Sequence, residues 1–303
     1  MVNDSTVSVI VPVRNRSDLL RNCLQALVDQ EWSFDFSEVL VCDDGSTENL
    51  RPTIEEFKGQ LPNLRLLCQA PKGPAAARNL GILSSDASIL VFLDSDVVCS
   101  PGFLKLITET LKSHSDWVGA EGSIKPIEGT AGPLWDSPAC DRGECYHTAA
   151  IAYPRKALVQ AGGFDQAFPF PACEDVELAA RVLNQGPIGF VYEAAVLHPR
   201  RPVTLRSRLL GRKHWKYVMI VAKRYGFLAF PGRRVGRFPR LRVALAAVIN
   251  LPGGRFLLAC KHVGQNPREA VLACLYAVFD VLCGLLALPE ILFAPVPPRR
   301  NYL

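Results

Sequence analysis

Residues 87–96 read ASILVFLDSD, an apolar run that ends in two carboxylates two residues apart. A short run rich in branched apolar residues is typical of a strand buried on both faces of a sheet. In the turn that follows it, Asp94 and Asp96 can offer oxygens to a divalent cation, which in turn can bridge to phosphate. The stretch therefore predicts a buried strand whose carboxyl end binds a cation and a phosphorylated ligand.

Similar strands precede this stretch. Apolar, strand-like runs occupy 7–13, 38–42 and 64–67, and apolar residues recur at helical spacing over 19–28 and 74–83. Strands and helices that alternate at this spacing predict an α/β fold with a parallel sheet. In such folds the ligand binds beyond the carboxyl ends of the strands.

The pattern changes after residue 100. Three further helices and a closing strand or hairpin are predicted there, at 103–112, 154–161, 174–184, 190–192 and 195–197. We place the end of this domain near residue 200, which divides the chain into a domain of residues 1–200 and a C-terminal region of residues 201–303.

Composition and charge support two regions with different tasks. The chain has 303 residues, of which 49% are hydrophobic and 21% charged, so a disordered chain is excluded. Residues 1–193 carry a net charge of −11 and residues 194–303 one of +16, with no acidic residue between Glu193 and Glu269. The N-terminus has no charged segment followed by an apolar one, so we expect no cleaved secretory signal.

The ten cysteines do not form a disulfide framework. Several lie inside apolar runs and no Cys-x-x-Cys pair occurs, which favours buried thiols in a reducing compartment. Cys140 and Cys145, beside His147, are the one group that resembles a zinc site. We do not favour zinc there, because a second pair of ligands is missing from the sequence.

The C-terminal region is basic and apolar. A basic helix is predicted over 205–225, and two apolar runs follow at 241–260 and 270–289, the first broken by Pro252-Gly253-Gly254-Arg255. The second run is about 20 residues long, enough to cross a bilayer. Because it contains the acidic Asp280, we favour interfacial or re-entrant helices over a true span or a buried helix pair at an oligomer interface.

Three acidic clusters follow predicted strands or open a predicted helix: Asp43-Asp44, Asp94-Ser95-Asp96 and Glu174-Asp175. Carboxylates that meet in one crevice repel each other unless a cation or a donor-rich ligand compensates them. Arg78 adds a guanidinium suited to phosphate. The sequence thus predicts a site for a divalent metal and a phosphorylated substrate.

These motifs together resemble the signature set of glycosyltransferase family 2. The segments that carry the resemblance keep the order and spacing of the family: VSVIVPVRNR at 7–16, VCDDGS at 41–46, GPAAARNLGI at 73–82, FLDSDVV at 92–98, GGFD at 162–165 and CEDVELAARV at 173–182. The resemblance covers residues 7–200. It implies a GT-A fold with a mixed central sheet, and an inverting, metal-dependent enzyme that uses a nucleotide-diphosphate sugar.

The resemblance also implies roles for individual residues. On the nucleotide-sugar side these are Pro12 and Arg14 at the nucleoside, Asp44 or the less favoured Asp43 at the base, Arg78 along the nucleotide, and Asp94 with Ser95 at the ribose or sugar. For the metal, Mn²⁺ or Mg²⁺, they are Asp96 and His198. For catalysis they are Asp175 as general base and Glu174 beside it, holding the acceptor. Where the family has a Gly-rich approach to this acidic pair, the chain has FPAC at 170–173.

We interpret the protein as an inverting glycosyltransferase, peripheral or integral on the cytoplasmic face of the cell membrane. Its acceptor would be a carbohydrate or lipid-linked molecule of the cell envelope, an exopolysaccharide or a glycolipid, and its basic region would contact anionic lipid. Two alternatives stay open: a sugar-phosphate nucleotidyltransferase, and a non-enzymatic protein that binds anionic surfaces or nucleic acid. A nucleic-acid partner is disfavoured because it leaves the aligned carboxylates unexplained, and a homo-oligomer is compatible with the apolar runs.

Overall fold

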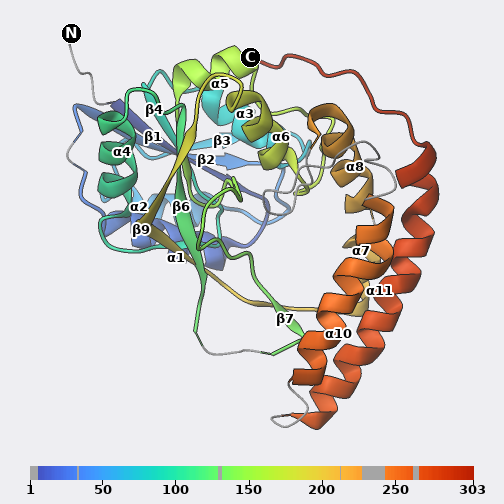
Figure 1. The fold of residues 1–303 in the computed structure, drawn as a ribbon. Coiled ribbons are helices and arrows are strands. Elements are labelled where there is room, and N and C mark those ends of the chain that lie inside the picture. The colour runs from blue at the N-terminus through green and yellow to red at the C-terminus, as the bar shows by residue number, and fades with distance from the viewer. Residues whose placement is uncertain (1–5, 33, 129–131, 212, 227–242, 262–265) are drawn as a thin grey trace. The chain divides into compact units, whose positions relative to one another are not determined.

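The structure is a computed structural model that describes residues 6–32, 34–128, 132–211, 213–226, 243–261 and 266–303. The chain divides into two compact units (Figure 1). The larger comprises residues 1–126, 138–199 and 299–303, and the smaller comprises 127–137 and 200–298.

The larger unit is built on one mixed sheet of eight strands in the order β3-β2-β1-β4-β8-β6-β9-β5. Its strands are β1 (Thr6–Val13), β2 (Phe36–Asp43), β3 (Arg65–Cys68), β4 (Ile89–Phe92), β5 (Val98–Cys99), β6 (Gly119–Pro126), β8 (Ile151–Pro154) and β9 (Ile188–His198). Strands β1 to β4 are parallel, as predicted, whereas β8 runs antiparallel to both β4 and β6. The GT-A prediction of a mixed sheet is confirmed.

Helices cover both faces of this sheet. The helices of the larger unit are α1 (Ser17–Val28), α2 (Arg51–Phe57), α3 (Pro74–Leu83), α4 (Phe103–Ser113), α5 (Arg155–Ala161) and α6 (Glu174–Val182). One face packs against α1, α2 and α4, and the other packs against α3, α5 and α6. Helix α3 approaches the sheet closely because Gly81 has no side chain: a Cβ there would lie 2.6 Å from the Ile10 side chain.

The closing element of the sheet is a single strand rather than a hairpin. Strand β9 pairs in parallel with β6, and its register shifts between Gly122 and Ser123. The shift accommodates extra residues of β9 without ending the strand, which is how a bulge bends a strand. The sequence shows two short apolar runs here because the bulge separates them.

The smaller unit is mainly helical. It contains α7 (Leu205–Gly211), α8 (His214–Tyr225), the π-helix η1 (Ala246–Asn250), α10 (Leu251–Lys261) and α11 (Pro267–Phe293), with a short pairing of β7 (Trp135–Asp136) and β10 (Arg201–Pro202). The basic helix predicted over 205–225 is therefore two helices. The break predicted at Pro252 is wrong: the chain stays helical there, and Pro252 is the second residue of α10, directly after the π-helix η1.

Helix α11 extends the second predicted apolar run to 27 residues. By length and composition it could cross a membrane, with a mean hydropathy of 2.4 in its most apolar window. Its acidic residue is not isolated: Asp280 is buried and forms an ion pair with the buried Arg208 of α7. An intrahelical acid that is paired in this way no longer argues strongly against an apolar environment.

Candidate active site

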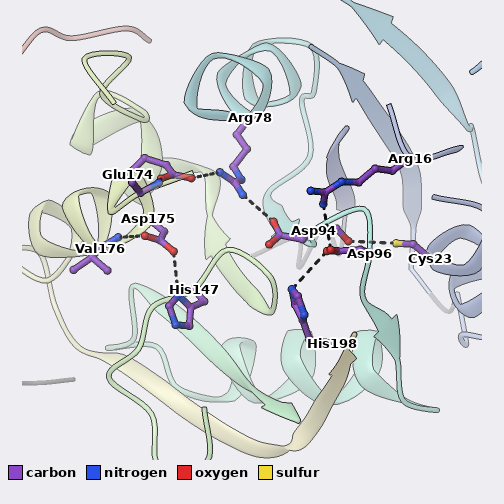
Figure 2. Close-up of polar contacts among 11 residues, drawn as sticks. Arg16, Cys23, Arg78, Asp94, Asp96, His147, Glu174, Asp175, Val176 and His198 are labelled. Atoms are coloured by element: carbon purple, nitrogen blue, oxygen red, sulfur yellow. Dashed lines mark hydrogen bonds and ion pairs between the residues drawn. The ribbon is translucent and has the colours of Figure 1, made fainter. Parts of the chain in front are cut away.

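The candidate site lies where parallel strands of the sheet end. Asp94 and Asp96 follow β4, and Asp43 and Asp44 stand at the end of β2 and just beyond it, with β1 between the two strands. Figure 2 shows the part of this site that is linked by polar contacts, with Arg78 between Asp94 and Glu174. The predicted convergence of strand ends on one edge of the sheet is therefore present.

A possible metal-binding group is formed by Asp94, Asp96 and His198. One ligand atom from each lies within 4.8 Å of the others. The side chains of Asp96 and His198 are only 2% exposed, and His198 Nε2 is 3.6 Å from Asp96 Oδ1. Arg16 Nη1 lies 3.4 Å from the other oxygen of Asp96 (Figure 2).

The tautomer of His198 suits a metal. Its Nδ1 lies 2.9 Å from the carbonyl oxygen of Pro199, which can only accept, so Nδ1 carries the proton. In the neutral ring the lone pair is then on Nε2, the atom that faces Asp96. Two carboxylates and an imidazole of this tautomer form a donor set that fits a divalent cation such as Mn²⁺.

Arg78 connects this group to the helix α6. Its guanidinium is 2.8 Å from Asp94 and 2.9 Å from Glu174, and the side chains of Arg78 and Glu174 are each 4% exposed. Burial raises the pKa of Glu174, as does the charge of Asp175, while Arg78 opposes both; the resulting pKa is about 7. Arg78 thus compensates a carboxylate on each side of the site.

Asp175 lies in the first turn of α6 and is paired with His147. The two side chains approach to 3.2 Å, and that of Asp175 is 15% exposed (Figure 2). Burial alone would raise the pKa of Asp175, but its hydrogen bond with His147 and the imidazolium charge hold the pKa below its usual value. Burial likewise opposes the charge on His147, yet Asp175 raises the pKa of His147 to about 9. At neutral pH the pair is therefore an aspartate and an imidazolium.

The residues predicted for the nucleoside occupy the adjoining loops. Asp43 accepts hydrogen bonds from the backbone and hydroxyl of Ser46 and so shapes its own turn. Asp44 is buried and accepts from Gln69 Nε2 and from two backbone N–H groups at 72 and 73, just before α3. Pro12 is half-buried in β1, whereas Arg14 is exposed and Ser95 is buried.

The structure therefore joins most of the predicted residues in one network. Contacts connect His198, Asp96 and Asp94 to Arg78 and Glu174, and Asp175 is the next residue in the chain. The residues at the nucleoside end, Pro12, Arg14, Asp43 and Asp44, lie on neighbouring strand ends and loops.

Two residues of this network were not assigned these roles from the sequence. Arg16, which reaches Asp96, has a left-handed backbone with φ of 64°, as does Asn15 with φ of 60°. Its place in the VPVRNR motif was the signal that could have identified it. His147 stands in the sequence beside Cys145 and Tyr146, and no pattern in the sequence connects it with Asp175.

The FPAC segment that departs from the family takes the shape that a glycine would. Cys173, the residue before α6, has a left-handed backbone with φ of 69°. This region favours glycine because a side chain is strained there. The turn that presents Glu174 and Asp175 therefore holds a cysteine in a backbone conformation that favours glycine.

Comparisons with known proteins agree with this geometry. The profile of glycosyl transferase family 2 matches residues 8–130. The glycosyltransferase AglE of Haloferax volcanii is 31% identical over 207 residues, which cover 65% of this chain and 67% of AglE. The chondroitin synthase of Escherichia coli is 25% identical over 65% of this chain, but the match spans only 35% of that enzyme. The chain belongs to glycosyltransferase family 2.

Solved structures share the fold at low sequence identity. The mannosyltransferase PcManGT of Pyrobaculum calidifontis, in complex with GDP-Man and Mn²⁺, superposes with a TM-score of 0.58 at 17% identity, covering 94% of this chain and 85% of its own. TarS 1–349 of S. aureus, in complex with UDP-GlcNAc, gives a TM-score of 0.55 at 16% identity, covering 92% and 81%. The protein is thus a glycosyltransferase with a GT-A fold. Membership of this family excludes the two alternatives left open by the sequence, a sugar-phosphate nucleotidyltransferase and a non-enzymatic binding protein.

Proposed function

We propose that the protein transfers a sugar from a nucleotide-diphosphate sugar to an acceptor hydroxyl with inversion at the anomeric carbon. The observation that carries the proposal is the continuous link from the Asp94, Asp96 and His198 group through Arg78 to Glu174 and its neighbour Asp175. This link connects a donor set for a metal with an ionised carboxylate. The GDP-Man and UDP-GlcNAc complexes of proteins with the same fold support a donor of this class.

Asp175 would act as the general base. Inversion needs a base that removes the proton of the acceptor hydroxyl on the side opposite the leaving group. His147 keeps Asp175 ionised and oriented through the contact at 3.2 Å. Glu174, fixed by Arg78 and by the backbone N–H of Ala172, would hold the acceptor beside it.

Asp96 and His198, with Asp94 beside them, would hold a divalent cation. When bound, Mn²⁺ or Mg²⁺ would neutralise the charge that develops on the departing diphosphate. Asp94 would also face the ribose or sugar, together with Ser95. Pro12, Arg14 and Asp44 would line the nucleoside pocket, with Asp43 shaping the turn beside it.

The test compares binding with turnover. A thermal-shift screen of nucleotide sugars with Mn²⁺ present identifies the donor, after which Asp175→Asn should reduce turnover by about 10²-fold or more with little change in donor affinity. Asp18→Asn, on the exposed surface of α1, serves as the control. Equal loss of binding and turnover in Asp175→Asn, or a product that retains the anomeric configuration, contradicts the proposed role.

We further propose that the smaller unit associates with the cytoplasmic face of the cell membrane, where a lipid-linked or other cell-envelope acceptor is found. The larger side chains of α11 that are exposed and apolar include Val271, Leu275, Val278, Leu282, Leu286 and Phe293. They lie three, four or seven residues apart and so form a stripe along the helix. Seventeen Lys and Arg between residues 194 and 268 supply charge for anionic lipid.

Flotation with vesicles that contain anionic lipid tests this location. Leu275→Glu should reduce the floated fraction, whereas Leu83→Glu, at an exposed apolar residue of the larger unit, should not. Full-length protein that stays in the soluble fraction in low salt contradicts membrane association. A soluble homo-oligomer that Leu275→Glu dissociates would assign the stripe to a second copy of the chain instead.

A further inference from the structure

A second group of metal-ligating side chains lies outside the network described above. It consists of Glu121 on β6 and of Cys140 and Cys145 in the segment between β7 and β8. One ligand atom from each lies within 4.8 Å of the others. Glu121 and Cys140 are buried, at 1% and 2% exposure, and Cys145 is half-buried. The sequence showed the two cysteines but not the carboxylate, which precedes Cys140 by 19 residues.

The loop that carries the cysteines is folded around this carboxylate. Glu121 Oε1 accepts from Cys140 Sγ at 3.4 Å, from the Cys145 N–H at 3.1 Å, and from the N–H of Tyr146. Backbone hydrogen bonds in both directions between Ile124 and Cys140 fix the start of the loop against β6.

The same loop holds unusual backbone conformations. Gly143, Glu144 and Tyr146 all have positive φ, of 76°, 62° and 57°. For Glu144 and Tyr146 this conformation is strained, and such strain persists where the surroundings impose it, often at a ligand site. The loop therefore turns sharply enough to bring both sulfurs to one carboxylate.

One ligand-to-ligand distance in this group agrees with a tetrahedral zinc ion. With Zn–S of about 2.3 Å and Zn–O of about 2.1 Å, adjacent sulfur and oxygen ligands lie about 3.5 Å apart. The Cys140 Sγ to Glu121 Oε1 distance is 3.4 Å. Four residues separate the cysteines, within the range usual for zinc ligand pairs. Thiolates favour Zn²⁺ over Mg²⁺ or Mn²⁺, so this group differs in chemistry from the carboxylate and imidazole group.

We propose that Glu121, Cys140 and Cys145 bind a zinc ion. Binding replaces the Sγ–H to Oε1 hydrogen bond by metal coordination and releases the two thiol protons, and water completes the coordination. The site holds the loop that ends at His147, two residues after Cys145, and so fixes the residue that contacts Asp175.

Zinc content tests the proposal directly. Full-length protein purified without a metal-affinity tag or chelator should contain about one Zn²⁺ per chain, and Cys145→Ser and Glu121→Gln should reduce it to background. Cys260→Ser is the matched control: it removes a thiol that also lies within hydrogen-bonding range of another, Cys274, and it should keep the zinc.

Cobalt substitution separates this site from the site of the nucleotide sugar. Co²⁺ should give a thiolate charge-transfer band in the wild type and in Asp96→Ala, and no band in Cys145→Ser. Wild-type protein that lacks both zinc and this band overturns the proposal, even if Cys145→Ser fails to fold. A Cys140–Cys145 disulfide, seen by mass spectrometry without reductant, or equal zinc loss in Cys260→Ser, overturns it as well.

Discussion

The substitution Arg78→Met tests whether one buried guanidinium holds the two halves of the site together. Arg78 and Glu174 are each 4% exposed and 2.9 Å apart, so the variant would leave Glu174 as a buried carboxylate without this compensating charge. Removing one partner of a buried pair costs about 3–5 kcal/mol of unfolding free energy. Asp94 adds less, because 34% of its side chain is exposed and solvent screens it.

The loss of stability in Arg78→Met should depend on pH, and it should be larger at alkaline pH than at acid pH. The pKa of Glu174 in the folded protein, about 7, is already above the usual value of 4.5, so its ionisation costs stability at higher pH. Without Arg78 the pKa of Glu174 rises further. Each added pKa unit lowers the unfolding free energy at alkaline pH by about 1.4 kcal/mol. When the pH falls through the folded pKa, Glu174 becomes neutral and this cost disappears. The difference in unfolding free energy between variant and wild type should therefore narrow towards acid pH. What remains there is the cost of the lost hydrogen bonds, about 1–3 kcal/mol.

Urea unfolding of the full chain at about pH 9 and about pH 5 measures this difference. Arg21→Ala, which removes a pair between side chains that are 43% and 46% exposed, is the control and should change stability little at either pH. If Arg78→Met loses as little stability as Arg21→Ala, or loses the same amount at both pH values, Arg78 does not compensate the charge of Glu174.

Three further predictions follow from the same contacts. His147→Ala should move the acid limb of the pH–rate profile to higher pH, because burial then raises the pKa of Asp175 without the opposing imidazolium. Arg78, Glu174 and the Cys173 thiol still face this carboxyl, and an unmoved limb would show that another group titrates. His198→Ala should raise the Mn²⁺ concentration needed for half-maximal turnover about 10-fold or more, and an unchanged Mn²⁺ dependence would remove His198 from the metal site. Arg208→Met should lower the unfolding free energy by about 3–5 kcal/mol, measured by denaturant titration, because it removes the buried cation that is paired with Asp280 of α11. Equal stability would show that this ion pair does not stabilise the smaller unit.

The strand ends were predictable from the sequence because each was a local signal. The run ending in Asp94 and Asp96 fixed a buried strand and its carboxylates without knowledge of the rest of the chain. The connection through Arg78 was not predictable: Glu174 lies 96 residues later, and only the packing of α3 and α6 on the same face of the sheet brings them together. The same holds for Glu121, which completes a ligand set begun by cysteines in a distant loop.

In the C-terminal region, composition predicted that helices occur, but the sequence did not predict where each helix begins and ends. Apolar periodicity over 205–225 continues across Gly211, so it could not separate α7 from α8. Asp280 looked isolated because its partner, Arg208, is 72 residues earlier. The periodicity of apolar residues does not reveal contacts between side chains that are distant in the sequence. A buried charge therefore looks unpaired in a single sequence even when the fold supplies its partner.

The contacts also distinguish the two groups of carboxylates by the histidine that each group meets. Both groups have guanidinium partners: Arg78 lies 2.9 Å from Glu174 and 2.8 Å from Asp94, and Arg16 lies 3.4 Å from Asp96. The guanidinium contacts alone therefore do not decide which group binds a cation. Asp175 meets His147, whose pKa is raised to about 9, so a metal there would face an imidazolium as well. Asp96 instead meets the Nε2 of His198, whose Nδ1 donates to a backbone carbonyl, and this arrangement supports the proposed metal site at the strand end.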